Sequence, residues 1–295
     1  MNDPRLEGLA VSLEQFGNGP GVVVTSQGAK VRELPIRPFK ELLQERGALV
    51  FRGFDASKSD FVGFARLFMK QVKTTPEVRR RRDKLHPGLQ TALLGNEGLN
   101  FHADFAQVPQ RTHIISFYCA VPAQWGGETL VTDGEELLRA LSPSTREALR
   151  TRRIRHSTTL DRANWSAFSG TQDATEIVRQ AREVPGLECV HNPDDTLTTH
   201  WVTSAVTPSV LRSEPCLCTN IFPGVYNGLV TTWEDGSPIP REITDEIQQK
   251  AAELSARIVW NRAGDFAIVD NTRYVHARTQ QDGIRVIFTM QGYVT

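Results

Sequence analysis

Long hydrophobic runs are missing from this chain of 295 residues. A membrane-spanning helix needs roughly 20 consecutive apolar residues, and no stretch approaches that length, so we expect no membrane segment. The N-terminal sequence MNDPRLEGLA lacks the basic and then apolar pattern of a signal peptide. The 34 basic residues balance the 34 acidic ones, which predicts neither a nucleic-acid nor a membrane partner. We therefore expect a cytoplasmic protein.

Cysteine is scarce, and the four residues are Cys119, Cys189, Cys216 and Cys218. They form no CxxC pair and no zinc-ribbon spacing. We interpret them as small buried side chains in a reducing compartment. Internal repeats and low-complexity linkers are also missing, so we expect a single domain over 1–295, and the sequence leaves its oligomeric state open.

Short β-rich segments recur along the chain and alternate with a few clusters of helices. Strands are predicted at 22–25, 48–54, 113–121, 128–133, 153–160, 187–191, 197–202, 216–222, 257–260, 266–270 and 284–293. Helices are predicted at 38–46, 59–72, 134–141, 143–152 and within 237–258. This pattern predicts a mainly β (α+β) fold, with a β-sandwich or jelly-roll core and flanking helices.

Two polar segments interrupt the pattern. Residues 73–98 read as a surface loop or lid, and 161–185 read as an insertion. The first contains the basic run RRRR at 79–82, which we interpret as a solvated surface, with contact to an acidic carrier protein or an anionic substrate as the alternative.

The stretch GLNFHADFAQVPQRTHIISFY, residues 98–118, places His102 two positions before Asp104. On a strand, both side chains would lie on one face and suit two ligands of one metal. A distant histidine would complete the two-histidine, one-carboxylate set of non-haem Fe(II) oxygenases. The candidates for that third ligand are His86, His113, His156, His191, His200 and His276.

His276 stands apart because it lies beside a predicted strand near the C-terminus, followed by Arg285 within the apolar run IRVIFTM. An arginine in such a run predicts an anionic partner, since an unpaired buried charge is costly. A dicarboxylate co-substrate would supply that anion, held by the arginine fork. The remaining histidines are interpreted as structural.

Three motifs then carry a family resemblance: FHADFAQVP, GGETLVTD and VDNTRYVHAR followed by GIRVIFTMQGY. In this order, over most of 95–295, they resemble the taurine-dioxygenase-type (TauD/TfdA) family of Fe(II)- and 2-oxoglutarate-dependent oxygenases. That family shares a double-stranded β-helix, or jelly-roll, fold. WEDGSPIPREITDEIQQ is similar to a helix of the branch that includes clavaminate-synthase-like proteins and syringomycin-type amino-acid hydroxylases.

The resemblance implies roles for five residues. His102, Asp104 and His276 would bind Fe(II), and the co-substrates would be 2-oxoglutarate and O2. Thr129 would hydrogen-bond a 2-oxoglutarate carboxylate, while Arg285 would pair with its C5 carboxylate. In related halogenases a small residue stands where Asp104 stands here, and chloride takes the vacant position, so we expect oxygenation and not halogenation.

The substrate is expected to be an amino acid or a small molecule derived from one in secondary metabolism, either free or bound to a carrier protein. Hydroxylation leads the possible outcomes, with desaturation, epoxidation and cyclisation as alternatives. Asn100, Gln107, Arg111 and Asn220 are candidates for contact with the substrate.

Two further side chains have open interpretations. Arg278 is expected to be a solvated charge, and Trp125 to line the co-substrate pocket or fill the core. The alternative to the whole enzyme hypothesis is a cupin-like jelly-roll that binds a metal or ligand without oxygenase chemistry. Such a protein would usually show two or more histidines in its first motif, and this chain shows one.

Overall fold

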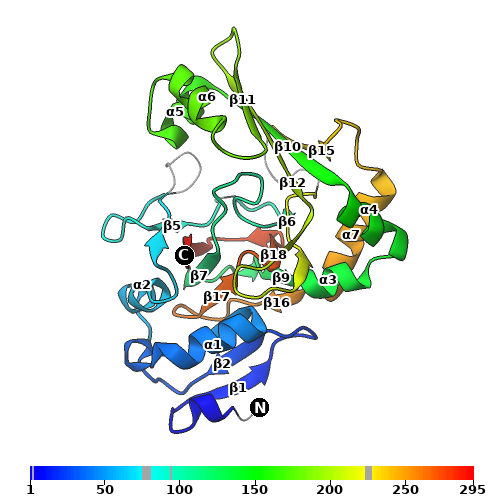
Figure 1. Cartoon of the computed structure of the whole chain (residues 1–295). Coiled ribbons are helices and arrows are strands. Elements are labelled where there is room, and N and C mark those ends of the chain that lie inside the picture. Colours follow the sequence, from blue (N-terminus) through cyan, green and yellow to red (C-terminus); the bar gives the residue numbers. More distant parts are fainter. Residues whose placement is uncertain (2, 75–80, 94, 223–227) are drawn as a thin grey trace.

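Two sheets form the centre of the molecule (Figure 1). The computed structural model describes residues 1, 3–74, 81–93, 95–222 and 228–295. The larger sheet has the order β1 (Ser12–Gln15), β2 (Val22–Thr25), β3 (Ala48–Arg52), β17 (Phe266–Asp270), β7 (Ile114–Val121), β20 (Val286–Tyr293) and β4 (Gln71–Val72), and β5 (Leu89–Thr91) also pairs with β20. The smaller sheet has the order β16 (Ala256–Ile258), β9 (Thr129–Asp133), β18 (Tyr274–Arg278) and β6 (Leu99–His102). All of these pairings are antiparallel except that of β2 with β3.

Side chains from both sheets share one apolar core, so the sheets pack against each other. Phe117 and Ile287 of the larger sheet meet Val131 and Ile258 of the smaller one. Because strand residues alternate between faces, each sheet keeps a second apolar face for helices. The predicted jelly-roll core with flanking helices is confirmed.

The outer face of the larger sheet is covered by α1 (Ile36–Arg46) and α2 (Lys58–Arg66). α1 ends, as predicted, before Gly47, whose φ of 74° suits glycine. A capping box between Ser57 and Asp60 opens α2. The prediction that this helix reaches residue 72 is wrong, because 71–72 pairs with β20 as strand β4.

The outer face of the smaller sheet is covered by α3 (Gly134–Ala140), α4 (Pro143–Thr151) and α7 (Arg241–Leu254). The two shorter helices begin after Asp133 and Ser142, whose side chains accept hydrogen bonds from the first turns. α7 stops short of the predicted 258 because 256–258 pairs with β9 as strand β16.

A third sheet stands above the core in Figure 1. Its order is β11 (Leu187–His191), β12 (Leu197–Ser204), β10 (Arg153–Leu160) and β15 (Leu229–Trp233), all antiparallel. The sequence patterns missed β15. The segment 161–185, expected as an insertion, contains α5 (Arg162–Ser169) and α6 (Ala174–Ala181), which lie beside this sheet.

Short elements complete the chain: η1 (Pro4–Leu6), η2 (Val31–Glu33), β8 (Trp125–Gly126), β13 (Val206–Pro208), β14 (Pro215–Leu217) and β19 (Gln281–Asp282). The strand expected over 216–222 is thus shorter than predicted. The expected loop 73–98 contains β5, while 75–80 and 94 lie outside the described residues. Of the basic run, Arg81 and Arg82 are exposed, and 79–80 falls within the range that is not described.

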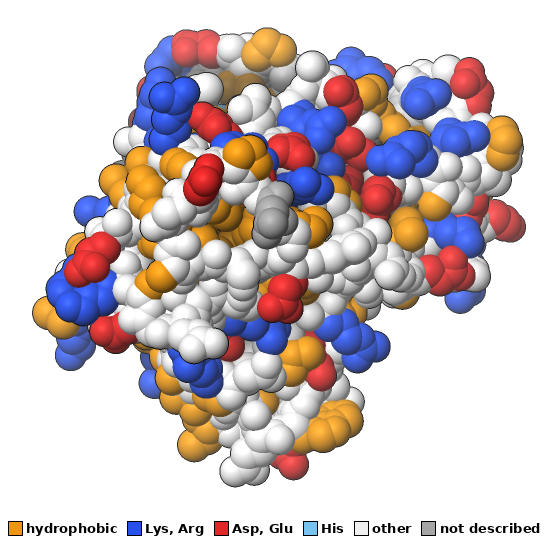
Figure 2. All heavy atoms as spheres, turned by 90° about the horizontal axis from the view of Figure 1, so that it is seen from below, with side chains coloured by type: hydrophobic (Ala, Val, Ile, Leu, Met, Phe, Trp, Pro, Cys, Tyr) orange, Lys and Arg blue, Asp and Glu red, His pale blue; other side chains and the backbone are white. Residues whose placement is uncertain are grey.

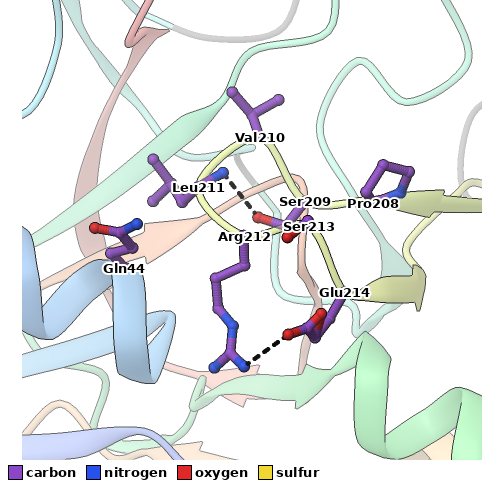
Figure 3. A pocket seen from close by; sticks show the side chains of 8 residues that line it. All are labelled: Gln44, Pro208, Ser209, Val210, Leu211, Arg212, Ser213 and Glu214. Carbon is purple, nitrogen blue, oxygen red and sulfur yellow. Dashed lines mark hydrogen bonds and ion pairs between the residues drawn. The ribbon is translucent and has the colours of Figure 1, made fainter.

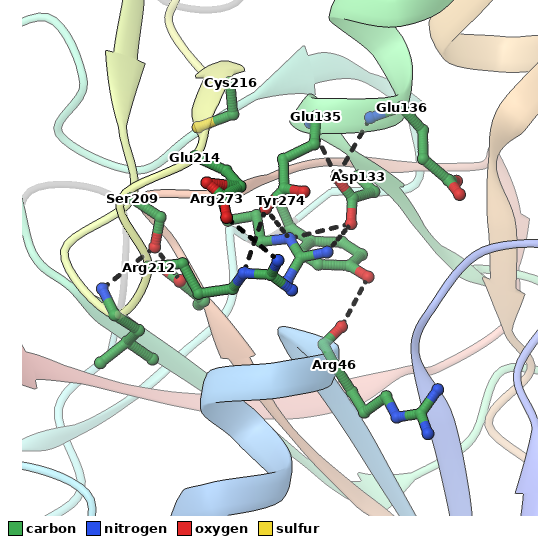
Figure 4. Close-up of polar contacts among 12 residues, drawn as sticks. Arg46, Asp133, Glu135, Glu136, Ser209, Arg212, Glu214, Cys216, Arg273 and Tyr274 are labelled. Carbon is green, nitrogen blue, oxygen red and sulfur yellow. Dashed lines mark hydrogen bonds and ion pairs between the residues drawn. The ribbon is translucent and has the colours of Figure 1, made fainter.

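A buried ion-pair network ties the smaller sheet to α1 (Figure 4). Arg273 is 2% exposed, and its Nη2 lies 2.6 Å from Asp133 Oδ2. Its Nε lies 3.1 Å from Glu135 Oε1, and its Nη1 donates a 3.0 Å hydrogen bond to the carbonyl of Glu45. The Tyr274 hydroxyl donates to the carbonyl of Arg46 at 2.9 Å. The C-terminal end of α1 is therefore held by the turn that precedes β18.

Next to this network, the loop 208–214 and Gln44 line an open depression of about 510 Å³ (Figure 3). Arg212 lies in it, 3.6 Å from Glu214 and 3.7 Å from Glu135. Because each charge there already has a partner, the depression continues the structural network.

The surface mixes both signs of charge. On the face drawn in Figure 2, Lys and Arg side chains are interspersed with Asp and Glu, in keeping with a formal net charge of zero. Among the described residues, no helix combines the length and the apolar character that crossing a bilayer requires.

Candidate metal centre

Two histidines meet on neighbouring strands of the smaller sheet. His102 ends β6 and pairs in register with His276 of β18, with ring centroids 4.3 Å apart. The ring of Phe117, from the larger sheet, lies 5.6 Å from that of His276, so both histidines face the space between the sheets. His102 Nδ1 lies 2.8 Å from the Asn100 carbonyl, which leaves its Nε2 directed at Asp104.

Asp104 does not lie on the strand, and the expected shared strand face is wrong. β6 ends at His102, and Asp104 lies in the turn that follows. The backbone of Asp104 is held by Asn271, whose Oδ1 accepts from its N–H at 3.0 Å and whose Nδ2 donates to its carbonyl at 2.8 Å. Asn271 lies in the turn between β17 and β18, so the same turn positions Asp104 and leads into His276.

The Asp104 carboxylate is oriented by a buried chain of hydrogen bonds. Gln291 Nε2 donates to Asp104 Oδ2, and Gln291 Oε1 accepts from the Thr112 hydroxyl at 3.0 Å. Asn271 Nδ2 donates to the Thr112 carbonyl at 2.8 Å, which closes the chain. The second carboxylate oxygen, Oδ1, lies 3.5 Å from His102 Nε2. The amide of Gln291 therefore engages one oxygen and leaves the other facing the histidines.

The geometry of these three side chains fits a divalent metal. One ligand atom from each of His102, Asp104 and His276 lies within 4.8 Å of the others, and all three residues are buried. Adjacent ligands of a metal bound at about 2.1 Å are about 3 Å apart, close to the 3.5 Å between His102 Nε2 and Asp104 Oδ1. Two imidazoles and one carboxylate are the donor set of the facial triad, which leaves open positions on the metal.

Thr129 and Arg285 lie together beside this centre. Thr129 begins β9, is 3% exposed, and its Oγ1 accepts a 3.1 Å hydrogen bond from Trp260 Nε1. Arg285 Nη2 lies 3.5 Å from the same oxygen. Gly127, at a φ of 71°, makes room for the arginine, because a Cβ there would stand 2.8 Å from Arg285 Cδ.

Arg285 makes no ion pair in the described part of the chain, and the charge of Glu128 acts on it only from farther away. Its Nε is buried and has no hydrogen-bond partner in that part of the chain. Burial, together with the nearby charge of Arg278, lowers the pKa of Arg285 to about 10. A carboxylate at this position would relieve both effects. Arg285 and the Thr129 hydroxyl therefore suit a carboxylate-bearing co-substrate.

One expectation from the sequence is wrong in this region, and one of the two alternatives for Trp125 is excluded. Arg278 is buried, because it donates to the carbonyls of Leu93, at 2.5 Å, and Glu97, at 2.6 Å. These hydrogen bonds hold the segment before β6 in place. Burial lowers the pKa of Arg278. Trp125 is 67% exposed, so it does not fill the core.

The four candidates for substrate contact occupy different positions. Asn100 is exposed, and its carbonyl faces His102. Asn220 is fully buried, accepts from the Ala103 N–H at 2.9 Å and donates to Gln107 at 2.6 Å. Arg111 donates to the carbonyls of Cys218, at 2.7 Å, and Asn271. Asn220 and Arg111 therefore support the loops around Asp104, and direct contact with substrate stays a prediction.

The other histidines have partners away from the centre. His156 is 1% exposed, and its ring nitrogens lie 2.9 Å from Thr231 Oγ1 and 3.3 Å from Thr219 Oγ1. Burial lowers the pKa of His156 to about 4. The remaining histidines also have polar partners: His86 contacts Ser59, His113 contacts the N–H of Val294, His191 contacts Asp195, and His200 contacts Ser157.

Sequence reasoning missed Asn271, Thr112, Gln291 and Trp260. One signal was present: Gln291 is a polar residue that ends an apolar β-run, as Arg285 is one that begins it. The others carry no local signal, because their role depends on residues more than 100 positions away in the chain.

Comparison with known proteins adds an independent finding. A family model described as "Taurine catabolism dioxygenase TauD, TfdA family" matches residues 12–291. Dapdiamide synthesis protein DdaC of Enterobacter agglomerans is 25% identical over 276 residues, which cover 85% of this chain and 83% of that protein. Pentalenolactone F synthase of Streptomyces arenae is 26% identical over 250 residues, which cover 79% and 77%.

Solved structures share the fold at lower identity. The PvcB protein of Pseudomonas aeruginosa has a TM-score of 0.64 and 15% identity, with 99% of this chain and 95% of that chain covered. A taurine dioxygenase of Burkholderia xenovorans has a TM-score of 0.64 and 15% identity, with 96% and 89% covered. These likenesses establish the arrangement of the sheets and helices.

Proposed function

Because this chain belongs to the TauD, TfdA family of dioxygenases, we propose that His102, Asp104 and His276 bind Fe(II) and that Thr129 and Arg285 bind 2-oxoglutarate. The enzyme class is 2-oxoglutarate-dependent dioxygenase. The observation that carries the residue assignment is the convergence of three buried metal-binding side chains from two strands and a turn. Arg285, which makes no ion pair among the described residues and lies beside Thr129, supports the proposed position of the co-substrate.

The proposed reaction oxidises an unactivated C–H bond. One substrate molecule, 2-oxoglutarate and O2 give hydroxylated substrate, succinate and CO2, with one oxygen atom in the new hydroxyl and the other in succinate. Bound Fe(II) supplies the activation of O2. Asp104 completes the protein ligands, so no position is left for chloride in its place, and we propose oxygenation and not halogenation.

The chain's own residues position the reactants and exclude water. Trp260 donates to Thr129 Oγ1, so the hydroxyl proton of Thr129 stays available to a 2-oxoglutarate carboxylate. The three proposed ligands are 7%, 2% and 6% exposed for His102, Asp104 and His276. Their burial keeps bulk water from the centre and strengthens the local electrostatics.

For the substrate, we propose an amino acid or a small molecule derived from one. Similarity to a protein named for dapdiamide synthesis supports this class, whereas similarity to a pentalenolactone F synthase supports only a small-molecule substrate in biosynthesis. The alternative of a cupin-like binding protein is disfavoured by the family match and by the paired Thr129 and Arg285.

Anaerobic titration with Fe(II) and then 2-oxoglutarate tests the proposal. We expect a weak visible charge-transfer band when both are bound, and Arg285→Met should weaken 2-oxoglutarate binding by about 100-fold, the size of a lost charge-assisted contact. Arg257→Met is the matched control, because Arg257 is an exposed arginine of the adjacent strand β16. A band whose 2-oxoglutarate dependence is the same in Arg285→Met and in the parent would contradict the assignment of Arg285.

Gln291→Leu should lower metal affinity by about 10- to 100-fold, the usual effect of losing a residue that orients a metal ligand. The reason is that Gln291 engages Asp104 Oδ2 and so directs Oδ1 toward the histidines. Co(II) binding, followed by absorption, measures the affinity without turnover. Gln71→Leu, at an exposed position of the neighbouring strand β4, is the control. Equal Co(II) affinity in both variants would remove Gln291 from the positioning role.

A further inference from the structure

The side of β20 that faces the smaller sheet carries polar side chains next to the metal centre. Phe288 and Met290 pack on the outer side with the helices, whereas Ile287 lies in the core between the sheets. Thr289 and Gln291 share the side of Ile287, because alternate strand residues face the same way. Thr289 is 2% exposed, and its Oγ1 has no hydrogen-bond partner among the described residues. A buried hydroxyl in this state calls for a polar partner.

Lys73 lies beside β20 and projects from the same side of the larger sheet. Its N–H donates a 2.8 Å hydrogen bond to the carbonyl of Gln291, next to the pairing of Val72 with Gly292. Cross-strand partners project to the same side of a sheet, so Lys73 faces the side on which Gln291 contacts Asp104. Its ammonium lies 3.2 Å from the Tyr293 hydroxyl.

The turn that carries Asp104 also packs against this lysine. Lys73 Nζ lies 4.5 Å from the ring centroid of Phe105, the residue directly after Asp104. Phe105 has a φ of 62°, a conformation that costs free energy for a residue other than glycine and that clusters at functional sites. This conformation brings the aromatic ring to the ammonium.

Lys73 makes no ion pair in the described part of the chain, and it is half-buried. A cation held partly out of water beside aromatic rings attracts an anion. Lysine contributes one compact charge, which matches a single carboxylate. Arg285 does not compete for that carboxylate, because it precedes β20 and stands six positions, at most about 20 Å along an extended chain, before Gln291.

We propose that Lys73 binds a carboxylate of the substrate and that the Thr289 hydroxyl bonds a second polar group of the same molecule. The substrate is then a free carboxylic acid, such as an unesterified amino acid, and not a carrier-bound thioester. This inference rests on the proposed function, since it places substrate beside Asp104, with 2-oxoglutarate at the Arg285 end.

Substrate-stimulated O2 consumption in the presence of Fe(II) and 2-oxoglutarate tests the inference. The probes are the twenty common L-amino acids in three matched forms: free acids, primary amides and pantetheine thioesters. We expect stimulation by one or more free acids and at least about tenfold weaker stimulation by the matching amides and thioesters. Lys73→Met, which keeps an unbranched stem against Phe105, should raise the KM for the stimulating acid by about tenfold.

Two further variants define the outcome. Lys73→Arg should retain the preference for the acid, and Lys70→Met, an exposed lysine one residue before β4, should behave as the parent. Amides or thioesters as effective as acids, no stimulation by any form, or an unchanged KM in Lys73→Met would each overturn the inference. The charge-transfer band separates this from failure of the proposed function, because the band must persist in Lys73→Met.

Discussion

His276→Ala is expected to abolish turnover and to weaken metal binding by more than about 100-fold, the upper range for residues that merely orient a ligand. His276 is one of three side chains whose ligand atoms lie within 4.8 Å of one another. Without it, one histidine and one carboxylate remain, which is a weak site for a divalent ion. The fold should survive, because Val275 and Ala277 on the other face of β18, and Tyr274 on the same face, still pack in the core. Co(II) titration and thermal unfolding measure the two effects separately.

His156→Ala is the matched control for this variant. His156 is as buried as His276, but it bonds Thr231 and Thr219 of neighbouring segments and lies outside the three-residue group. We expect it to lose stability, by about 1–3 kcal/mol, with unchanged Co(II) affinity. The assignment of the metal ligands fails if His276→Ala binds Co(II) as tightly as the control does.

Arg273→Met should lower the free energy of unfolding by about 3–5 kcal/mol, the usual cost of removing one partner from a buried ion pair. Arg273 is 2% exposed and serves two carboxylates, those of Asp133 and Glu135 (Figure 4). Methionine fills the volume of the stem but leaves Asp133 without its cation and Glu135 with only the 3.7 Å contact to Arg212. Urea unfolding of the parent and the variant, with the same slope for both, measures the difference.

Arg212→Met tests whether burial is the cause. Arg212 reaches the same Glu135, but its side chain is 30% exposed and the contact is 3.7 Å long. Exposed pairs contribute at most about 1 kcal/mol, so this variant should unfold close to the parent. A loss in Arg273→Met no larger than in Arg212→Met would contradict the central place of Arg273 in the network.

The Arg273 network and the metal centre share one turn. Asn271 binds the backbone of Asp104, Arg273 follows two residues later, and His276 comes three residues after that. Anchoring this turn to α1 therefore also limits the positions available to Asp104 and His276. A weaker affinity for Co(II) in Arg273→Met, in addition to the loss of stability, would be the signature of this coupling.

Several features of this protein follow from local sequence alone. The turn and helix signals at Gly47 and Ser142 predict where α1 ends and α4 begins, because these preferences act within one helical turn. The strand alternation, with its helices in between, predicts the jelly-roll class. The motifs around His102, Thr129 and His276 name the residues that the structure then brings together.

Tertiary structure alone decides which side chains those motifs meet. From the sequence Arg278 is expected to be a solvated charge, yet it is buried and donates to backbone carbonyls some 180 positions earlier in the chain. Asp104 leaves its strand because Asn271, 167 residues away, supplies the hydrogen bonds that a strand neighbour would have supplied. Lys73 faces the site only through the register of β4 on β20. Local preferences span a few residues, whereas these contacts exist only once distant strands pair, and that pairing is set by burial of the whole core.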